Sequence, residues 1–199
     1  MKQKISLSTS VAIFIISSLL ISGCTTKKST DTNLDLNTMP TSSQTTVIPS
    51  KTETNGNPVV SLKTKDGEIL LKLYQDKAPN TVANFIKKTN DEFYNGLIFH
   101  RVIPGFMAQG GDPEGTGMGG GDIKSEINNV PFVRGTIGLA RGMNKEISND
   151  SQFFICFSTN GCQHLTSDYV NFGEVVSGLD VLDKNNQGDK IIEITTKTK

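Results

Sequence analysis

Two runs of alternating apolar and polar residues, 59–64 and 68–74, flank a tight turn and restrict how this chain can fold. The turn contains Asp66-Gly67, and an Asp-Gly pair between two such runs is a strong β-hairpin signal. Further short strand-like runs, separated by loops rich in glycine and asparagine, follow at residues 97–102, 106–109, 136–140, 152–157, 172–176 and 190–195. The sequence therefore predicts many short strands, which are typical of a closed barrel or a sandwich.

Two stretches with helical spacing interrupt the strand pattern. The first begins at Ala78-Pro79, and proline is favoured in the first turn of a helix. Val82, Phe85 and Ile86 then recur at the spacing that forms one apolar stripe on a helix. The second stretch is short and covers residues 179–183. We expect two helices that pack against the strands.

The N-terminus has the composition of a targeting segment. Positive charge precedes an apolar run at residues 11–21, which is shorter than the roughly 20 residues of a membrane-spanning helix and has the proportions of a signal peptide. Leu-Ile-Ser-Gly-Cys at residues 20–24 resembles the lipobox of bacterial lipoproteins. The resemblance implies cleavage after Gly23 and a lipid, such as palmitate, on Cys24. An uncleaved anchor and an ordinary signal peptide with a chance cysteine are the alternatives.

The segment that follows is rich in threonine, serine and asparagine, with only isolated hydrophobic residues. It buries too little apolar surface to offset its chain entropy, so we expect a disordered tether. The predicted organisation is a signal peptide at 1–23, the lipidated cysteine and tether at 24–57, and one folded domain at 58–199. The domain would work outside the cytoplasm, on the outer face of the plasma membrane, or at the outer membrane in a host that has one.

The charge content narrows the classes of binding partner that the chain could have. Basic and acidic residues number 20 each, which gives no reason to expect a nucleic-acid partner. No pattern suggests an oligomer seam, so we expect a monomer.

Cys156 and Cys162 lie six residues apart in a disulfide-permissive compartment. A disulfide and two free thiols both remain open, because geometry decides between them.

Three stretches of the predicted domain resemble signatures of the cyclophilin-type peptidyl-prolyl cis/trans isomerases. The longest is Phe-His-Arg-Val-Ile-Pro-Gly-Phe-Met-Ala-Gln-Gly-Gly-Asp at residues 99–112. Ser-Gln-Phe-Phe-Ile at 151–155 and Asn-Phe-Gly-Glu-Val at 171–175 are similar to the two others. The resemblance implies a mainly β fold: a closed eight-stranded antiparallel barrel capped by two α-helices, with its binding groove on the outer wall.

The resemblance also implies site residues. Arg101 falls on the family's catalytic arginine. The positions that line the family's proline pocket are occupied by Phe106, Met107, Gln109, Gln152, Phe154 and Leu165. The segment that contacts the substrate backbone corresponds to Gly142, Met143 and Asn144. By residue type alone, the apolar members of this set would be core residues.

Two pocket positions depart from the best-known eukaryotic pattern. His164 stands where a tryptophan often occurs, and Tyr169 where a histidine often occurs. Both exchanges resemble those of bacterial members. The departures therefore imply weakened cyclosporin binding more than a loss of isomerase activity.

The implied reaction is rotation about prolyl peptide bonds, with proline-containing peptides and unfolded secreted or envelope proteins as substrates. The barrier of about 18–20 kcal/mol arises because the nitrogen lone pair is delocalised into the carbonyl. Twisting localises that lone pair, and a cationic donor such as Arg101 stabilises the twisted state more than the planar ones. The reaction requires no covalent step, metal or cofactor. A proline-binding module and a structural envelope scaffold are the competing functions.

Other chemical signals in the sequence are weaker. Residues 115–120 satisfy the Gly-x-Gly-x-x-Gly pattern but lack the strand and helix of a dinucleotide site, so we interpret them as a loop beside the groove. The acidic residues around that loop do not have the spacing of a calcium-binding loop. Cys162 and His164 are close in sequence, which alone does not indicate a catalytic pair.

Overall fold

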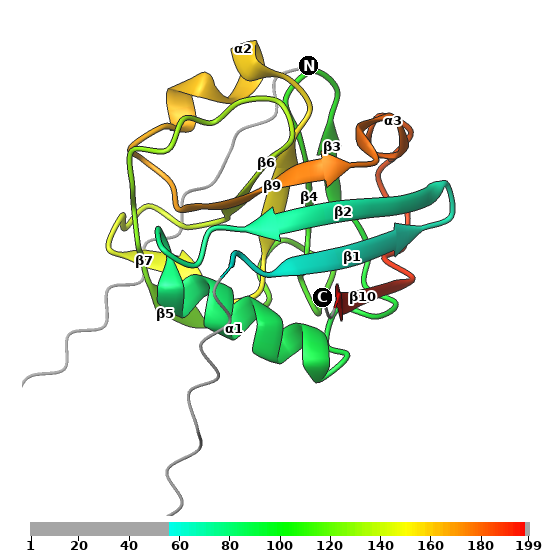
Figure 1. Cartoon of the computed structure of the whole chain (residues 1–199), viewed down its shortest axis with the longest axis horizontal. Coiled ribbons are helices and arrows are strands. Elements are labelled where there is room, and N and C mark those ends of the chain that lie inside the picture. The colour runs from blue at the N-terminus through cyan, green and yellow to red at the C-terminus, as the bar shows by residue number, and fades with distance from the viewer. Residues whose placement is uncertain (1–55, 198–199) are drawn as a thin grey trace, which may run out of the picture. The chain divides into compact units, whose positions relative to one another are not determined.

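The computed structural model describes residues 56–197, which form the folded part of the chain drawn in colour in Figure 1. The predicted signal peptide, Cys24 and almost all of the predicted tether lie outside the described residues. Within 56–197, no helix is long and apolar enough to cross a membrane.

One antiparallel sheet of eight strands dominates the fold, in the order β10-β1-β2-β9-β6-β8-β4-β3 (Figure 1). Its members are β1 (Val59–Thr64), β2 (Gly67–Leu73), β3 (Arg101–Ile103), β4 (Met107–Gly110), β6 (Thr136–Leu139), β8 (Phe153–Cys156), β9 (Asn171–Ser177) and β10 (Glu193–Lys197). β1 and β2 form the predicted hairpin. Every strand-like run of the sequence thus contributes to this sheet, although β3 and β10 begin later than predicted.

The prediction of a closed barrel is wrong, because the sheet is open between its edge strands β3 and β10. The segments before these strands meet at one isolated bridge, between Ile98 and Lys190. Phe99 extends this join by donating to Asp189 O and accepting from Gly188 N, each at 2.9 Å. Residues 183–188 form turns and irregular chain, so they cannot continue the join as a regular ladder.

Both predicted helices are present, as α1 (Pro79–Asn90) and α3 (Leu179–Leu182). The apolar stripe of α1 buries Val82 and Phe85, while Ile86 packs at the edge of the core. Several short elements were not predicted: the helix α2 (Thr159–Cys162), a 3₁₀ turn (Gln163–Leu165), and a two-stranded sheet of β5 (Asp122–Lys124) and β7 (Ile147–Asn149). Each of these elements has three or four residues and lies in a stretch without a longer apolar run that would indicate it.

Strand β8 separates two apolar clusters. Side chains alternate between the faces of a strand, so Phe153 and Ile155 join the main core while Phe154 and Cys156 face the other way. The second cluster consists of the buried residues Met107, Phe132, Phe154, Cys156, Cys162 and Leu165, flanked by Ile103, Phe106 and Tyr169. We call it the outer cluster, and it forms the base of the candidate site.

Candidate active site

The register of β3, β4 and β8 gathers the predicted site residues on one face of the sheet. Arg101 lies opposite Gln109, and Gln109 lies opposite Phe154 on its other side. A hollow of about 110 Å³ opens over these residues, which we call the proline hollow. Its lining consists of Arg101, Phe106, Met107, Gln109, Ala140, Arg141, Phe154, Leu165 and Tyr169.

The inner part of the proline hollow is apolar and rigidly packed. Phe154 stacks on Phe132 with ring centroids 5.6 Å apart, and meets Tyr169 edge to face at 5.9 Å. Met107 and Leu165 are buried beside it. Aromatic pairs in these arrangements stabilise each other beyond simple area burial. The hollow therefore offers a preformed apolar cup to a small ring.

A series of hydrogen-bonded side-chain amides leads away from Arg101. Nη1 of Arg101 donates to Oε1 of Gln109 at 3.4 Å, and Nε2 of Gln109 donates to Oε1 of Gln152 at 2.9 Å. Nε2 of Gln152 donates in turn to the carbonyls of Gly119 at 2.8 Å and Gly117 at 3.1 Å. A guanidinium carries five N–H donors, so the contact with Gln109 leaves others to face the hollow. The predicted residue Gln152 thus supports the hollow from behind.

The glycine-rich loop at residues 115–120 anchors this series of amides. Asp112 accepts backbone hydrogen bonds from Glu114 at 2.9 Å and from Gly117. Burial opposes the charge of Asp112, but the backbone donors outweigh it and the carboxyl pKa is lowered. Asn149 donates to the Gly119 carbonyl at 3.0 Å. The loop pattern set aside in the sequence therefore supplies carbonyl acceptors for Gln152.

Arg141 is a lining residue that the sequence did not predict. Its guanidinium carbon lies 4.3 Å from the centroid of the Tyr169 ring, a cation–π arrangement. Its Nη2 donates to Oδ2 of Asp168 at 2.9 Å. The neighbouring Ala140 also lines the hollow. Ala140 ends a predicted strand-like run and both residues precede the predicted segment Gly142 to Asn144, but no sequence signal marked either as a site residue.

Some predicted site residues lie outside the proline hollow. His164 is exposed and packs against Phe106, with ring centroids 5.8 Å apart, so it stands at the rim. The predicted segment 142–144 lines a separate hollow of about 290 Å³, formed by Asp122, Gly142, Met143, Asn144, Ile147, Ser148 and Asn149. Met143 is completely exposed there. The structure thus places most of the predicted residues at two separate hollows, with His164 at the rim of the proline hollow and Gln152 behind it.

Cys156 and Cys162 form a disulfide, which settles the question left open by their spacing. Both residues are buried in the outer cluster beneath the proline hollow. The bond ties β8 to α2, which leads directly into the 3₁₀ turn that carries His164 and Leu165. Since Cys162 is bonded, it has no thiol to pair with His164. Within residues 56–197, no group of three or more His, Cys, Asp or Glu residues is placed to hold a metal ion.

Comparisons with known proteins agree with this geometry. The family described as "Cyclophilin type peptidyl-prolyl cis-trans isomerase/CLD" matches residues 59–198. A peptidyl-prolyl cis-trans isomerase of Synechococcus elongatus is 44% identical over 142 residues, covering 69% of this chain and 94% of that protein. Peptidyl-prolyl cis-trans isomerase B of Bacillus subtilis is 42% identical over 133 residues, covering 65% and 92%.

A solved structure is also similar to this chain. It is a cyclophilin-type peptidyl-prolyl cis-trans isomerase of Cryptosporidium parvum, determined in the presence of the dipeptide Ala-Pro. The two share 30% identity with a TM-score of 0.65, covering 71% of this chain and 99% of the other.

Proposed function

The chain belongs to the cyclophilin-type peptidyl-prolyl cis/trans isomerase family, and on that premise we propose that it assists the folding of secreted or envelope proteins, with Arg101 as its main catalytic residue. The isomerase activity itself follows from the family match and from bacterial isomerases at 42–44% identity. Uncatalysed prolyl isomerisation takes tens to hundreds of seconds, which is slow enough to limit folding.

The observation that carries the proposed mechanism is the position of Arg101 at the exposed edge of an apolar hollow. The proline ring of a substrate would rest on Met107, Phe154 and Leu165, which are already packed in place. The guanidinium would then donate to the prolyl nitrogen as rotation localises its lone pair. This interaction is absent in either planar state, so it lowers the barrier instead of tightening binding uniformly.

Substrate selection follows from the same lining. The inner hollow contacts a ring through apolar side chains, while Gln109 and Arg101 provide polar groups at one edge. The relative from Cryptosporidium parvum was studied with Ala-Pro, which supports proline-containing peptides as the substrate class. We propose that the residues around the proline are read mainly through their backbone.

The test is the isomerisation of a short Xaa-Pro peptide by wild-type protein and the Arg101→Ala variant. We expect kcat/KM to fall at least about a hundredfold, as when one preorganised donor is removed from a transition state. Arg101 is exposed, so the thermal unfolding midpoint should not change. Arg134→Ala is the matched control, because Arg134 is an arginine bound to Asp183 outside the proline hollow. Full activity in Arg101→Ala would overturn the assigned role.

We also propose that the protein is lipid-anchored outside the cytoplasm. The support is the lipobox-like sequence at residues 20–24 and the buried Cys156–Cys162 disulfide, since disulfides persist in oxidising compartments. Membrane fractionation of cells that express wild-type or Cys24→Ala protein tests the anchor. We expect wild-type protein in the membrane fraction and loss of lipid from Cys24→Ala. Equal lipid incorporation in both would contradict Cys24 as the attachment site.

A further inference from the structure

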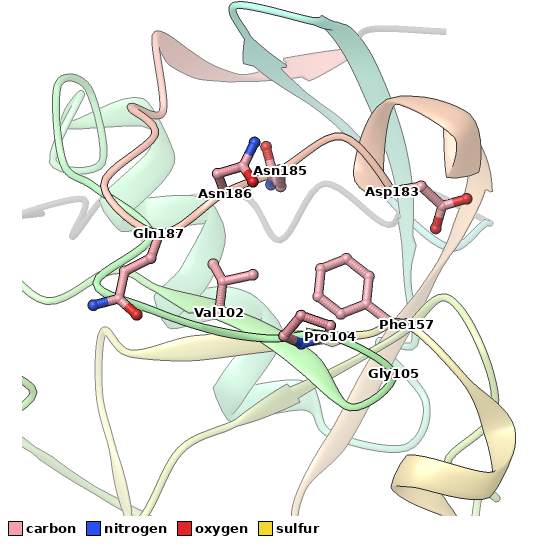
Figure 2. Close-up of a pocket in the computed structure, with 8 residues that line it drawn as sticks. All are labelled: Val102, Pro104, Gly105, Phe157, Asp183, Asn185, Asn186 and Gln187. Atoms are coloured by element: carbon pink, nitrogen blue, oxygen red, sulfur yellow. The ribbon is translucent and has the colours of Figure 1, made fainter.

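A third hollow, of about 390 Å³, lies along the open seam of the sheet (Figure 2). We call it the seam hollow, and its lining consists of Val102, Pro104, Gly105, Phe157, Asp183, Asn185, Asn186 and Gln187. Val102 alternates with Arg101 along β3, so the two side chains point to opposite faces of the strand. The seam hollow is therefore distinct from the proline hollow.

The seam hollow exists because the two ends of the sheet separate. The join between them reaches Phe99 and Gly188, beyond which β3 and residues 183–187 diverge. β3 is an edge strand of the sheet, and no other strand of the described region pairs with its outer side. An unpaired strand edge is a template for an extended peptide, which adds to the sheet through backbone hydrogen bonds.

Asn185 supplies an unusual polar group in the wall of this hollow. Only 4% of the residue is exposed, and neither Oδ1 nor Nδ2 has a hydrogen-bond partner among the described residues. Burying such groups without partners is unfavourable. A side-chain amide carries an acceptor and a donor, which match the N–H and C=O that one residue of an extended chain presents on the same side. Both amide atoms are buried, so an incoming backbone would satisfy them once the Asn185 side chain turns toward the hollow.

The remaining lining indicates an uncharged ligand. Asp183 is its one ionisable residue, and both carboxylate oxygens accept from Arg134, at 2.9 and 2.8 Å. Figure 2 shows Asn185 and Asn186 on one side of the hollow, with Val102, Pro104 and Phe157 on the other. The polar side suits a backbone, while the apolar side suits an aliphatic side chain.

We propose that the seam hollow is a second polypeptide-binding site, which takes an extended, uncharged segment as an added strand along β3. Asn185 binds the N–H and C=O of one residue of that segment, and Val102, Pro104 and Phe157 contact a side chain of the segment. The inference rests on the proposed function in taking the ligand from the same polypeptide substrate. Gly105 lines the seam hollow and Phe106 lines the proline hollow, so one chain passing the β3–β4 turn reaches both. Two linked contacts strengthen the binding of long substrates over short ones.

The experiment uses a proline-free, uncharged probe, acetyl-Ser-Val-Leu-Ser-Val-amide, titrated by NMR against the full chain. Asn185→Leu is the test variant, because it keeps a similar volume and removes the unpartnered amide. We expect its Kd for the probe to rise at least about tenfold, as for the loss of one pair of hydrogen bonds. Its thermal unfolding midpoint should be equal to or above that of wild type. Asn90→Ala is the matched control, since Asn90 is exposed at the end of α1.

Saturating Ala-Pro should leave the probe bound, because the proposed function places the dipeptide in the proline hollow. The inference is overturned if the wild-type chain does not bind the probe, if Asn185→Leu binds it equally well, or if Ala-Pro displaces it. Should Asn185→Leu fail to fold, Asn185→Ala replaces it, because alanine adds no volume. The change in its Kd for the probe is interpreted in the same way. Turnover of an Xaa-Pro peptide by wild type is measured in parallel. Turnover without probe binding refutes only the seam site, and probe binding without turnover refutes only the proposed function.

Discussion

Gln109 donates a hydrogen bond from Nε2 to Oε1 of Gln152 across 2.9 Å, and this contact fixes which end of the Gln109 amide faces Arg101. An amide has its donor and its acceptor on opposite arms. Because Gln152 takes the donor, the oxygen is left to accept from Nη1 of Arg101. A residue that does not line the proline hollow therefore orients the group that lies beside the proposed catalytic arginine.

Loss of this orientation should reduce turnover without unfolding the protein. In Gln152→Leu, Gln109 loses its acceptor and the Arg101 guanidinium loses a fixed neighbour. We expect kcat/KM for a short Xaa-Pro peptide to fall roughly tenfold, as for the loss of one hydrogen bond to a charged group. Gln152→Glu keeps the acceptor for Gln109 but cannot donate to Gly119, so its kcat/KM should be intermediate. Wild-type kcat/KM in Gln152→Leu would contradict a positioning role.

The disulfide should control the shape of the proline hollow. Reduction frees α2 and the following turn, which carries His164 and the outer-cluster residue Leu165. We expect a reductant to raise KM for the Xaa-Pro peptide and to lower the free energy of unfolding by about 2 kcal/mol, as for a short cross-linked loop. The Cys156→Ala/Cys162→Ala double variant is the control, and its KM should not respond to reductant. An equal response there would locate the effect outside this bond.

Glu126 should stabilise the first turn of α1, whose own N-cap residue provides no side-chain hydrogen bond. Its carboxylate accepts from the backbone N–H of Asn80 at 3.1 Å and of Thr81 at 2.8 Å. Burial opposes the charge, but these donors outweigh it and lower the pKa of Glu126 below its ordinary 4.5. A lowered carboxyl pKa adds stability above pH 4.5 that is lost as the pH falls through the folded-state value.

Glu126→Gln should therefore lower the free energy of unfolding by about 1 kcal/mol at pH 7, the usual effect of removing a helix cap. The difference from wild type should shrink as the pH falls below 4.5. Urea unfolding across this range measures both effects. Glu146→Gln is the control, because Glu146 is exposed. A constant difference at every pH would rule out the carboxylate charge as the cause.

His100 should make the fold sensitive to mild acid. Neither imidazole nitrogen has a hydrogen-bond partner among the described residues. Burial lowers the pKa of His100 below its ordinary 6.5, with Arg101 adding to the effect and Asp112 opposing it. The unfolded chain therefore binds more protons than the native protein between 6.5 and the lowered value, and stability falls as the pH decreases through that window.

His100 contributes at most about 1.4 kcal/mol per pH unit to the slope of the free energy of unfolding against pH. His100→Gln should remove it, which urea unfolding between pH 7.5 and pH 5 can measure. His164→Gln is the control for the substitution itself, since His164 is exposed. If His100→Gln retains the full slope, another group causes the acid sensitivity.

Much of the secondary structure was predictable because its signals are local. The Asp66-Gly67 turn specifies its hairpin through a few adjacent residues, and Pro79 marks the start of α1. The elements that were missed, such as β5 and α2, span three or four residues. They are held by neighbours distant in the chain, such as Ile123 paired with Ser148. No local periodicity of apolar residues therefore predicts them.

The candidate site also has features that the sequence predicted and features that it did not. The motif at residues 99–112 by itself determined that Arg101, Phe106, Met107 and Gln109 would lie together at the proline hollow, because they follow one another on two paired strands and the turn between them. Tertiary structure alone decided the open seam, the Cys156–Cys162 bond and the place of Arg141 beside Tyr169. Each depends on where separate segments meet in space, and the distance between two such segments is set by the packing between them, which no single stretch of sequence contains.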